Sequence, residues 1–197
     1  MRGDNDMKAY GDQIAQLLVE DHTIAEEEKR IYSYIFDYVI ENVIYTCILL
    51  LIGLLCGRLG VTICYLLVAM PLRWFAGGYH ANSRKECNVL SYGVFAIVLF
   101  VVPHIAPLLH LEWTMLYGIG WIGILAVAPV DTPNKRLSPG QRALLHRRCI
   151  MLYIGLSLVE GWLWWQQKNL YYAAISICVI IELIGLLMGI AKNRREL

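Results

Sequence analysis

Six apolar runs separated by short polar segments make up most of this chain, and they constrain its fold more than any other feature. They cover residues 43–56, 59–72, 88–109, 113–130, 149–165 and 170–191. A helix that spans a membrane needs about 20 apolar residues, with a range of about 17 to 25, and the last four runs reach or approach that length. Only 17% of the residues are charged, whereas a typical soluble domain has about a quarter. The sequence therefore predicts an all-α, polytopic membrane protein with about six transmembrane helices.

The first two apolar runs are short, and the segment "GRLG" at residues 57–60 separates them. We interpret them as two short helices joined by a tight hairpin, which extend into the headgroup region or thin the bilayer locally. A single re-entrant hairpin is the alternative, and it would leave five or fewer true spans. Pro71 is expected to end the second run, because proline does not continue a helix cleanly.

Residues 10–41 contain too many charged residues for a membrane span, yet their apolar residues recur at helical spacing. This pattern predicts amphipathic helices that lie on the membrane surface. A soluble helical cap is the alternative interpretation. We therefore predict two parts: residues 1–41 form cytoplasmic or interfacial amphipathic helices, and residues 42–197 form a single transmembrane domain.

The distribution of Lys and Arg predicts the orientation of this six-span arrangement. If the N-terminus is cytoplasmic, Arg58 and Lys168 are the only two of the 17 Lys and Arg residues that fall in outer loops. The positive-inside rule strongly favours this orientation. Both termini and residues 73–92 are therefore expected at the cytoplasmic face. No basic cluster with interleaved aromatic residues indicates binding to nucleic acid.

The polar segment "RWFAGGYHANSRKECNVLSY", residues 73–92, stands out between the second and third apolar runs. Gly77 and Gly78 permit backbone angles closed to other residues and a close approach of another chain segment. Ser83 followed three residues later by Glu86 is a capping-box pattern. The third membrane helix is therefore expected to begin with Arg84, which places Cys87 in its first turn. Unpaired N–H groups and the positive end of the helix dipole stabilise an anion there, and a thiolate is such an anion.

A His and a Cys seven residues apart could form a catalytic pair at this place. On one continuous helix, His80 and Cys87 would be about 10.5 Å apart along the axis, too far for a hydrogen bond. A break before the helix start lets the chain fold back, so that His80 could act as the base for a Cys87 nucleophile. The alternative is that both residues are inert, as most Cys and His residues are. The six cysteines include no C-x-x-C pair, so we predict no metal site, disulfide framework or cofactor.

The segment resembles the AgrB family, the accessory gene regulator B proteins of bacterial quorum-sensing systems. Arg73, Gly77, Gly78, His80 and Cys87 carry the resemblance, and the loop "APVDTPNKRL" at residues 128–137 is similar to the family's second recognisable stretch. The resemblance implies a multi-pass cysteine endopeptidase of the bacterial cell membrane, with its partners being the lipid membrane and a short AgrD-like precursor peptide. It implies that Cys87 is the nucleophile and His80 the general base, and that Arg73 and Gly78 match positions required in the family.

The resemblance further implies how the product forms. The enzyme cuts near the C-terminal side of the precursor, and a nucleophilic side chain of the peptide captures the thioester. The product is then a cyclic thiolactone or lactone signal.

Other roles stay open at the level of the sequence. Asp131 could orient the imidazole of His80, as a carboxylate does in catalytic triads, or could simply begin a turn in "DTPN". Arg73 could anchor the helix at the membrane surface or clamp an acidic part of the substrate. A homodimer is also an option.

Two other classes of protein compete with the peptidase. A peptide transporter or receptor without catalysis would need polar groups in mid-membrane, and only Glu160 and Glu182 lie well inside the last two runs. Either carboxylate could equally face a partner helix. A membrane acyltransferase that uses the same pair on lipid is the third option.

Overall fold

The computed structural model describes residues 3–78, 84–108, 111–131 and 137–195 of the chain. Every element in these ranges is a helix, as the apolar pattern predicts. The chain divides into two compact units, Met1–Ile52 and Gly53–Leu197. The predicted N-cap Ser83 and the predicted base His80 lie outside the described residues.

The first unit consists of α1 (Gly3–Glu20), the short 3₁₀ helix η1 (Glu26–Glu28) and most of α2 (Lys29–Leu55). The backbone N–H of Gly11 donates to Oδ1 of Asp37 at 3.2 Å, and Lys29 Nζ lies 3.4 Å from Oδ1 of Asp12. These contacts hold α1 against α2. The amphipathic segment and the first apolar run form one continuous helix, so the boundary predicted after residue 41 lies inside α2.

The turn between α2 and α3 (Leu59–Ala76) forms the tight hairpin that the glycines predict. Gly57 has a φ of 66°, and the N–H of Arg58 donates to the carbonyl of Gly53 at 2.7 Å. The prediction that both helices are short was wrong, because α2 has 27 residues and α3 has 18. The helix α2 begins before its apolar run, at Lys29, and α3 continues after its run to Ala76. The polar residues in these extensions keep the helical hydrogen bonding of the backbone.

The expectation that Pro71 ends its helix was also wrong, since α3 continues through Pro71 to Ala76. A proline inside a helix removes one N–H donor and crowds the preceding turn. Membrane helices tolerate this because neighbouring helices satisfy the freed carbonyl groups. The extra turn matters for the site, because it carries Arg73 to the end of α3.

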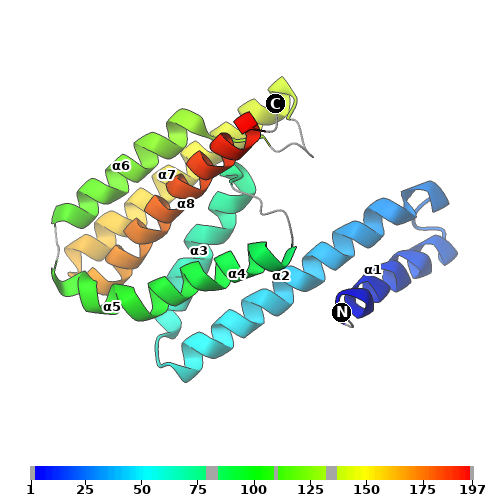
Figure 1. Cartoon of the computed structure of the whole chain (residues 1–197), viewed down its shortest axis with the longest axis horizontal. Helices are drawn as coiled ribbons and strands as arrows, with labels where there is room; N and C mark the ends of the chain where they lie inside the picture. Colours follow the sequence, from blue (N-terminus) through cyan, green and yellow to red (C-terminus); the bar gives the residue numbers. More distant parts are fainter. Residues whose placement is uncertain (1–2, 79–83, 109–110, 132–136, 196–197) are drawn as a thin grey trace. The chain divides into compact units, whose positions relative to one another are not determined.

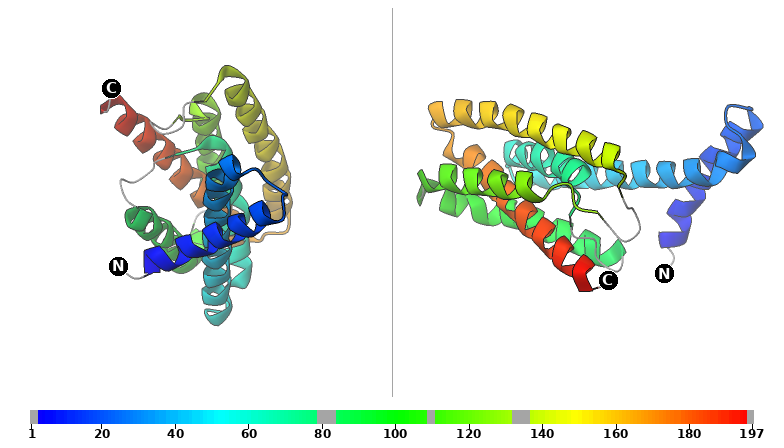
Figure 2. Two further views of the ribbon diagram at one scale, coloured as in Figure 1. Left: turned by 90° about the vertical axis from the view of Figure 1, so that its right-hand side faces the viewer. Right: turned by 90° about the horizontal axis from the view of Figure 1, so that it is seen from above.

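In the second unit, α8 (Asn169–Arg195) packs against α6 (Leu111–Val127), α7 (Pro139–Trp165) and α3 (Figures 1 and 2). Small residues allow the close approach: Ala173 and Ala174 are fully buried, and a β-carbon on Gly120 would lie 2.6 Å from Val179. Helices in membranes associate through such close packing, because lipid gives no hydrophobic drive between them. The buried rings of Trp113 and Trp121 fill the remaining space.

The third apolar run forms a continuous but irregular helix. Its described part consists of α4 (Arg84–Ala96), the π-helical turn η2 (Ile97–Val101), α5 (Val102–Ile105) and the 3₁₀ turn η3 (Ala106–Leu108). Pro103 stands at the start of α5, where its missing N–H disturbs the regular ladder. This places Cys87 one turn from the start of a long apolar helix.

Four helical segments of the described chain are long and apolar enough to cross a membrane, namely Glu26–Leu55, Leu59–Ala76, Glu86–Leu108 and Asn169–Arg194. This fits a multi-pass membrane protein. The apolar helix α6 is shorter, at 17 residues, and the first half of α7 carries several Arg residues. The six-span arrangement therefore stays a prediction, with α6 and α7 as its two remaining candidates.

Candidate functional site

The end of α3 and the start of α4 bring Arg73 and Cys87 together. Nη2 of Arg73 donates a hydrogen bond to Sγ of Cys87 at 3.3 Å, in a partly buried position. Cys87 is neither exposed nor sealed in the core. A guanidinium is always charged and presents a rigid fork of donors, and its hydrogen bonds to anions are stronger than those between neutral groups. The sequence named both residues, but it did not predict that they touch.

Gly77 and Gly78 terminate α3 in a conformation that favours glycine. Their φ angles are 83° and 142°, a region that other residues rarely adopt. A β-carbon on Gly77 would lie 2.7 Å from the carbonyl oxygen of Val130, and the N–H of Val130 donates to the carbonyl of Ala76 at 2.9 Å. The two recognisable stretches of the sequence, residues 73–92 and 128–137, therefore meet at this turn.

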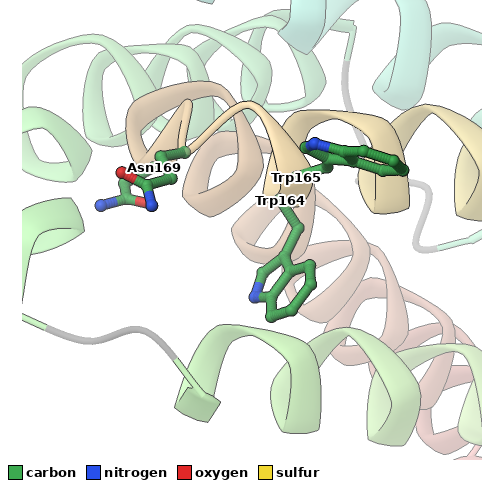
Figure 3. A pocket seen from close by; sticks show the side chains of 4 residues that line it. Trp164, Trp165 and Asn169 are labelled. Carbon is green, nitrogen blue, oxygen red and sulfur yellow. The ribbon is translucent and has the colours of Figure 1, made fainter.

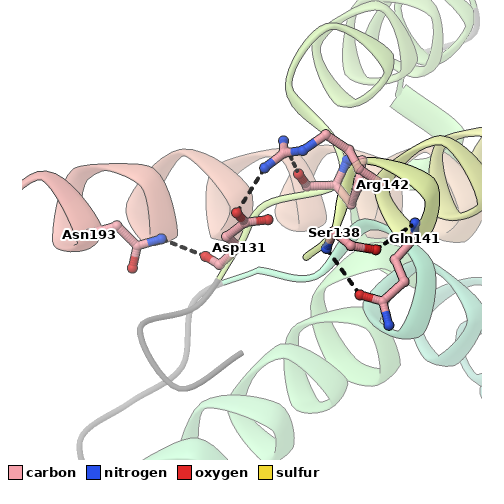
Figure 4. A network of polar contacts seen from close by, with 6 residues as sticks. Asp131, Ser138, Gln141, Arg142 and Asn193 are labelled. Atoms are coloured by element: carbon pink, nitrogen blue, oxygen red, sulfur yellow. Dashed lines mark hydrogen bonds and ion pairs between the residues drawn. The ribbon is translucent and has the colours of Figure 1, made fainter. Parts of the chain in front are cut away.

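Asp131 lies in the segment that meets the Gly77 turn, and its carboxylate is engaged elsewhere. Its Oδ2 forms an ion pair with Nη2 of Arg142 at 2.8 Å, and its backbone carbonyl accepts a hydrogen bond from Nδ2 of Asn193 at 2.6 Å (Figure 4). Nη1 of Arg142 also donates to the carbonyl of Pro129 at 3.2 Å. Asp131 thus ties the segment to α7 and α8. Its predicted role as orienter of His80 stays a prediction, because His80 lies outside the described residues.

The start of α7 is fixed by a capping box that the sequence reasoning did not identify. The N–H of Gln141 donates to Oγ of Ser138 at 3.3 Å, and the N–H of Ser138 donates to Oε1 of Gln141 at 3.0 Å (Figure 4). The signal was present in the sequence as Ser138 followed three residues later by Gln141, with Pro139 in the first turn. This cap positions Arg142 next to Asp131.

Glu182 of α8 lies beside the same glycine turn. Its side chain is only 9% exposed, and its Oε1 would lie 3.3 Å from a β-carbon on Gly78. The sequence marked Glu182 only as an acid inside an apolar run, so its place next to Gly78 comes from the packing of α8 on α3.

Glu160 of α7, the other acid inside the last two apolar runs, faces a partner helix. Its Oε1 accepts a hydrogen bond from Oγ of Ser176 on α8 at 2.8 Å, and it is 4% exposed. Nearby, the hydroxyl groups of Tyr117 and Ser157 lie 3.0 Å apart. This arrangement is an interhelical polar contact of the kind that links membrane helices.

A pocket at the turn between α7 and α8 is lined by Trp164, Trp165, Gln167 and Asn169 (Figure 3). The side chains of both tryptophans are mostly exposed, which is typical of residues at a membrane–water interface. The pocket contains none of the predicted site residues. It lies at the opposite end of α7 from Arg142, the partner of Asp131.

Comparison with protein-family models gives one match, to AgrB, accessory gene regulator B, over residues 12–186. The match covers most of the chain, including Arg73, Cys87, Asp131 and Glu182. Comparison with curated proteins and with solved structures gave no match.

Proposed function

The chain belongs to the AgrB family, and on that premise we propose that it is a membrane cysteine endopeptidase that cleaves and cyclises a quorum-sensing propeptide. Membership places it among membrane proteins that process autoinducing peptides. Cys87 is the nucleophile in this proposal and His80 the general base. Arg73, Gly77 and Gly78 support the nucleophile, and an AgrD-like precursor is the substrate.

The contact between Arg73 and Cys87 is the observation that carries the proposal. A cysteine attacks as the thiolate, and cations next to the sulfur favour that form. Arg73 Nη2 donates to Sγ at 3.3 Å, and Cys87 lies in the first turn of α4, where the helix dipole also favours an anion. A cysteine that served only for packing would have no need of a charged donor at this distance.

The reaction proceeds in two steps on the same sulfur. In the first step, the Cys87 thiolate attacks the scissile carbonyl, the C–N bond breaks, and the C-terminal fragment leaves as an amine with a proton from the imidazolium of His80. In the second step, His80 removes a proton from a thiol of the bound peptide, which attacks the thioester. The bond to Cys87 then breaks, the thiolate is regenerated, and the peptide leaves as a thiolactone.

Cyclisation must compete with hydrolysis of the thioester. Exchange of one thioester for another is close to neutral in free energy, whereas hydrolysis is downhill. The peptide thiol therefore has to win by proximity and by exclusion of water. The partly buried position of Cys87 between the ends of two apolar helices suits this requirement. A substrate that lies on the membrane would reach the sulfur from the proposed cytoplasmic face.

Cleavage of the AgrD-like precursor by Cys87→Ala and Cys56→Ala variants tests the proposal. Cys56 is exposed at the α2–α3 turn, so its variant controls for the loss of a thiol. We expect the Cys56→Ala variant to cleave the precursor normally and the Cys87→Ala variant to accumulate it uncut at equal membrane abundance. Normal cleavage by the Cys87→Ala variant would contradict the proposal and favour a transporter or receptor.

A trapping experiment distinguishes the peptidase from an acyltransferase acting on lipid. Mass spectrometry of the Cys87 peptide after brief reaction should show an added peptide fragment that neutral hydroxylamine removes, as expected for a thioester. A fatty-acyl adduct on Cys87 in place of the peptide would identify the acyltransferase.

A further inference from the structure

The backbone that follows α6 is buried although it belongs to no helix. Ala128, Pro129 and Val130 are all buried, and they come directly after the last turn of α6, where carbonyl groups have no partner within the helix. Buried backbone groups need hydrogen-bond partners from elsewhere in the protein. The partners of residues 128–130 therefore show which elements hold this segment in place.

Two side chains one turn apart on α7 bind the carbonyl groups of the segment. Nδ1 of His146 lies 3.0 Å from the carbonyl oxygen of Ala128, and Nη1 of Arg142 donates to the carbonyl oxygen of Pro129 at 3.2 Å. A carbonyl oxygen can only accept, so Nδ1 of His146 carries the hydrogen and donates it. Residues four apart lie on the same face of a helix, and this face of α7 therefore holds the segment.

The other end of the segment holds α3. The N–H of Val130 donates to the carbonyl oxygen of Ala76 at 2.9 Å, and a β-carbon on Gly77 would lie 2.7 Å from the carbonyl oxygen of Val130. Val130 thus meets the last residue of α3, three positions after Arg73. Residues 128–130 form a bridge between α7 and the end of α3, and His146 binds the first residue of that bridge.

A second contact from α7 reaches the same end of α3. The guanidinium carbon of Arg148 lies 5.7 Å from the centroid of the Phe75 ring, within the range in which a cation is attracted to an aromatic face. Phe75 directly precedes Ala76, the partner of Val130. The last turn of α3 is therefore held by α7 in two ways, directly and through residues 128–130.

We propose that His146 is a positioning residue for the Cys87 site, which acts through residues 128–130 to hold the last turn of α3. That turn carries Arg73, whose Nη2 donates to Sγ of Cys87 at 3.3 Å. This role rests on the proposed function of Cys87 as the nucleophile. An imidazole suits the role because it is rigid, so that little conformational entropy is lost when its N–H binds one carbonyl group.

Asparagine and glutamine at position 146 separate the hydrogen bond from the rest of the side chain. The amide nitrogen of Asn lies close to the place of Nδ1 in His, whereas the amide nitrogen of Gln lies close to the place of Nε2. His146→Asn therefore keeps the donor toward Ala128, and His146→Gln removes it while keeping a polar side chain of similar size. Arg147→Gln, which removes an exposed cation from the next position of α7, is the control.

Hydrogen exchange at the N–H of Val130 measures whether the bridge is loosened. The full-length protein in detergent is analysed by mass spectrometry with fragmentation to single residues. We expect this N–H to exchange about three- to ten-fold faster in His146→Gln, the effect of about one neutral hydrogen bond. Exchange should stay normal in His146→Asn and Arg147→Gln. Unchanged exchange in His146→Gln would overturn the proposal.

Alkylation of Cys87 by iodoacetamide measures whether the effect reaches the site, with the exposed Cys56 as an internal standard. We expect His146→Gln to slow alkylation of Cys87 about three-fold relative to Cys56, because a looser end of α3 keeps Arg73 less often on the sulfur. Faster exchange at Val130 with unchanged alkylation would mean that His146 only supports the fold, and would overturn the proposal. Faster alkylation would also overturn it, because residues 128–130 would then shield the sulfur.

The rescue variant keeps the test decisive if His146→Gln is too unstable to purify. His146→Asn should be alkylated at the normal rate, and a folded His146→Asn protein as slow as Arg73→Gln would contradict the proposal. Neither measurement needs the precursor peptide. Failure of this inference can therefore be told apart from failure of the proposed function, which cleavage by Cys87→Ala decides.

Discussion

Nη2 of Arg73 at the end of α3 lies 3.3 Å from Sγ of Cys87 in the first turn of α4, and the two residues are fourteen positions apart in the chain. A cation on one helix thereby meets a thiol on the next, at the place where two apolar helices end. The glycine turn that follows α3 and the buried acid on α8 complete the surroundings.

Arg73→Gln should lower the rate of precursor cleavage by about ten- to a hundred-fold. A hydrogen bond to a charged group contributes about 1.5–3 kcal/mol, and each 1.4 kcal/mol is about a factor of ten. Arg73→Lys keeps the charge but loses the rigid fork of donors. Its cleavage rate should therefore fall between those of the unchanged protein and the Arg73→Gln variant. Arg147→Gln removes an exposed cation from α7 and serves as the control in a kinetic assay on purified protein. A fall of the same size in the control would show that the total positive charge matters, and not the contact with Cys87.

Gly77→Ala should destabilise the protein more than Gly57→Ala. Both glycines have positive φ angles, and an L-residue there costs about 1–2 kcal/mol. Only Gly77 also lacks space, because its β-carbon would lie 2.7 Å from the carbonyl oxygen of Val130, whereas nothing lies within 4 Å of a β-carbon on Gly57. Thermal unfolding in detergent should give a lower midpoint for Gly77→Ala. Equal midpoints would mean that the segment around Val130 moves aside at no cost.

Asp131→Asn and Arg142→Gln should have similar, small effects on cleavage, within about two-fold of each other. Each variant breaks the same ion pair, and a partly exposed pair contributes about 0–1 kcal/mol. The hypothesis that Asp131 orients His80 predicts a different result, in which Asp131→Asn lowers cleavage far more than Arg142→Gln does. Steady-state rates of the two variants, compared at equal amounts of folded protein, decide between these outcomes.

Cysteines placed at the two ends of α7 should react from opposite sides of the membrane. Gly140 lies in the first turn with open space around it, and Gln166 is exposed just after the last turn. Labelling with a membrane-impermeant maleimide in a background without native cysteines should modify Gly140→Cys only in inverted vesicles and Gln166→Cys only in intact cells. Modification of both from one side would mean that α7 does not cross the membrane, and would contradict the six-span arrangement.

Glu160→Gln and Ser176→Ala should affect stability and leave cleavage by folded protein unchanged. The hydrogen bond between the two side chains joins α7 to α8, and such bonds in membranes contribute about 0.6 kcal/mol on average, up to about 2. The unfolding midpoint should therefore fall slightly in both variants. Loss of cleavage in Glu160→Gln at a normal midpoint would instead give this carboxylate a part in the reaction.

Local sequence patterns predicted much of the fold, because apolar runs, turn glycines and helix caps depend on residues close together in the chain. The apolar runs predicted an all-helical membrane protein, the glycines of "GRLG" predicted the α2–α3 turn, and Ser83 with Glu86 predicted a helix start at Arg84. These patterns predicted the helix ends wrongly where helices continue past the apolar runs. Neither Pro71 nor the charged residues before residue 42 end their helices, since one lost hydrogen bond or a polar surface does not end a helix that is otherwise supported.

The sequence by itself determined that Cys87 is placed at a helix start between apolar segments, because capping and hydropathy depend only on neighbours in the chain. Only the tertiary structure decided what surrounds the sulfur. The packing of α8 on α3 places Glu182 beside Gly78, and the extra turn of α3 after Pro71 carries Arg73 to Cys87. Contacts between residues 14 and 104 positions apart depend on how helices pack, and the spacing of residues along one chain carries no record of that packing.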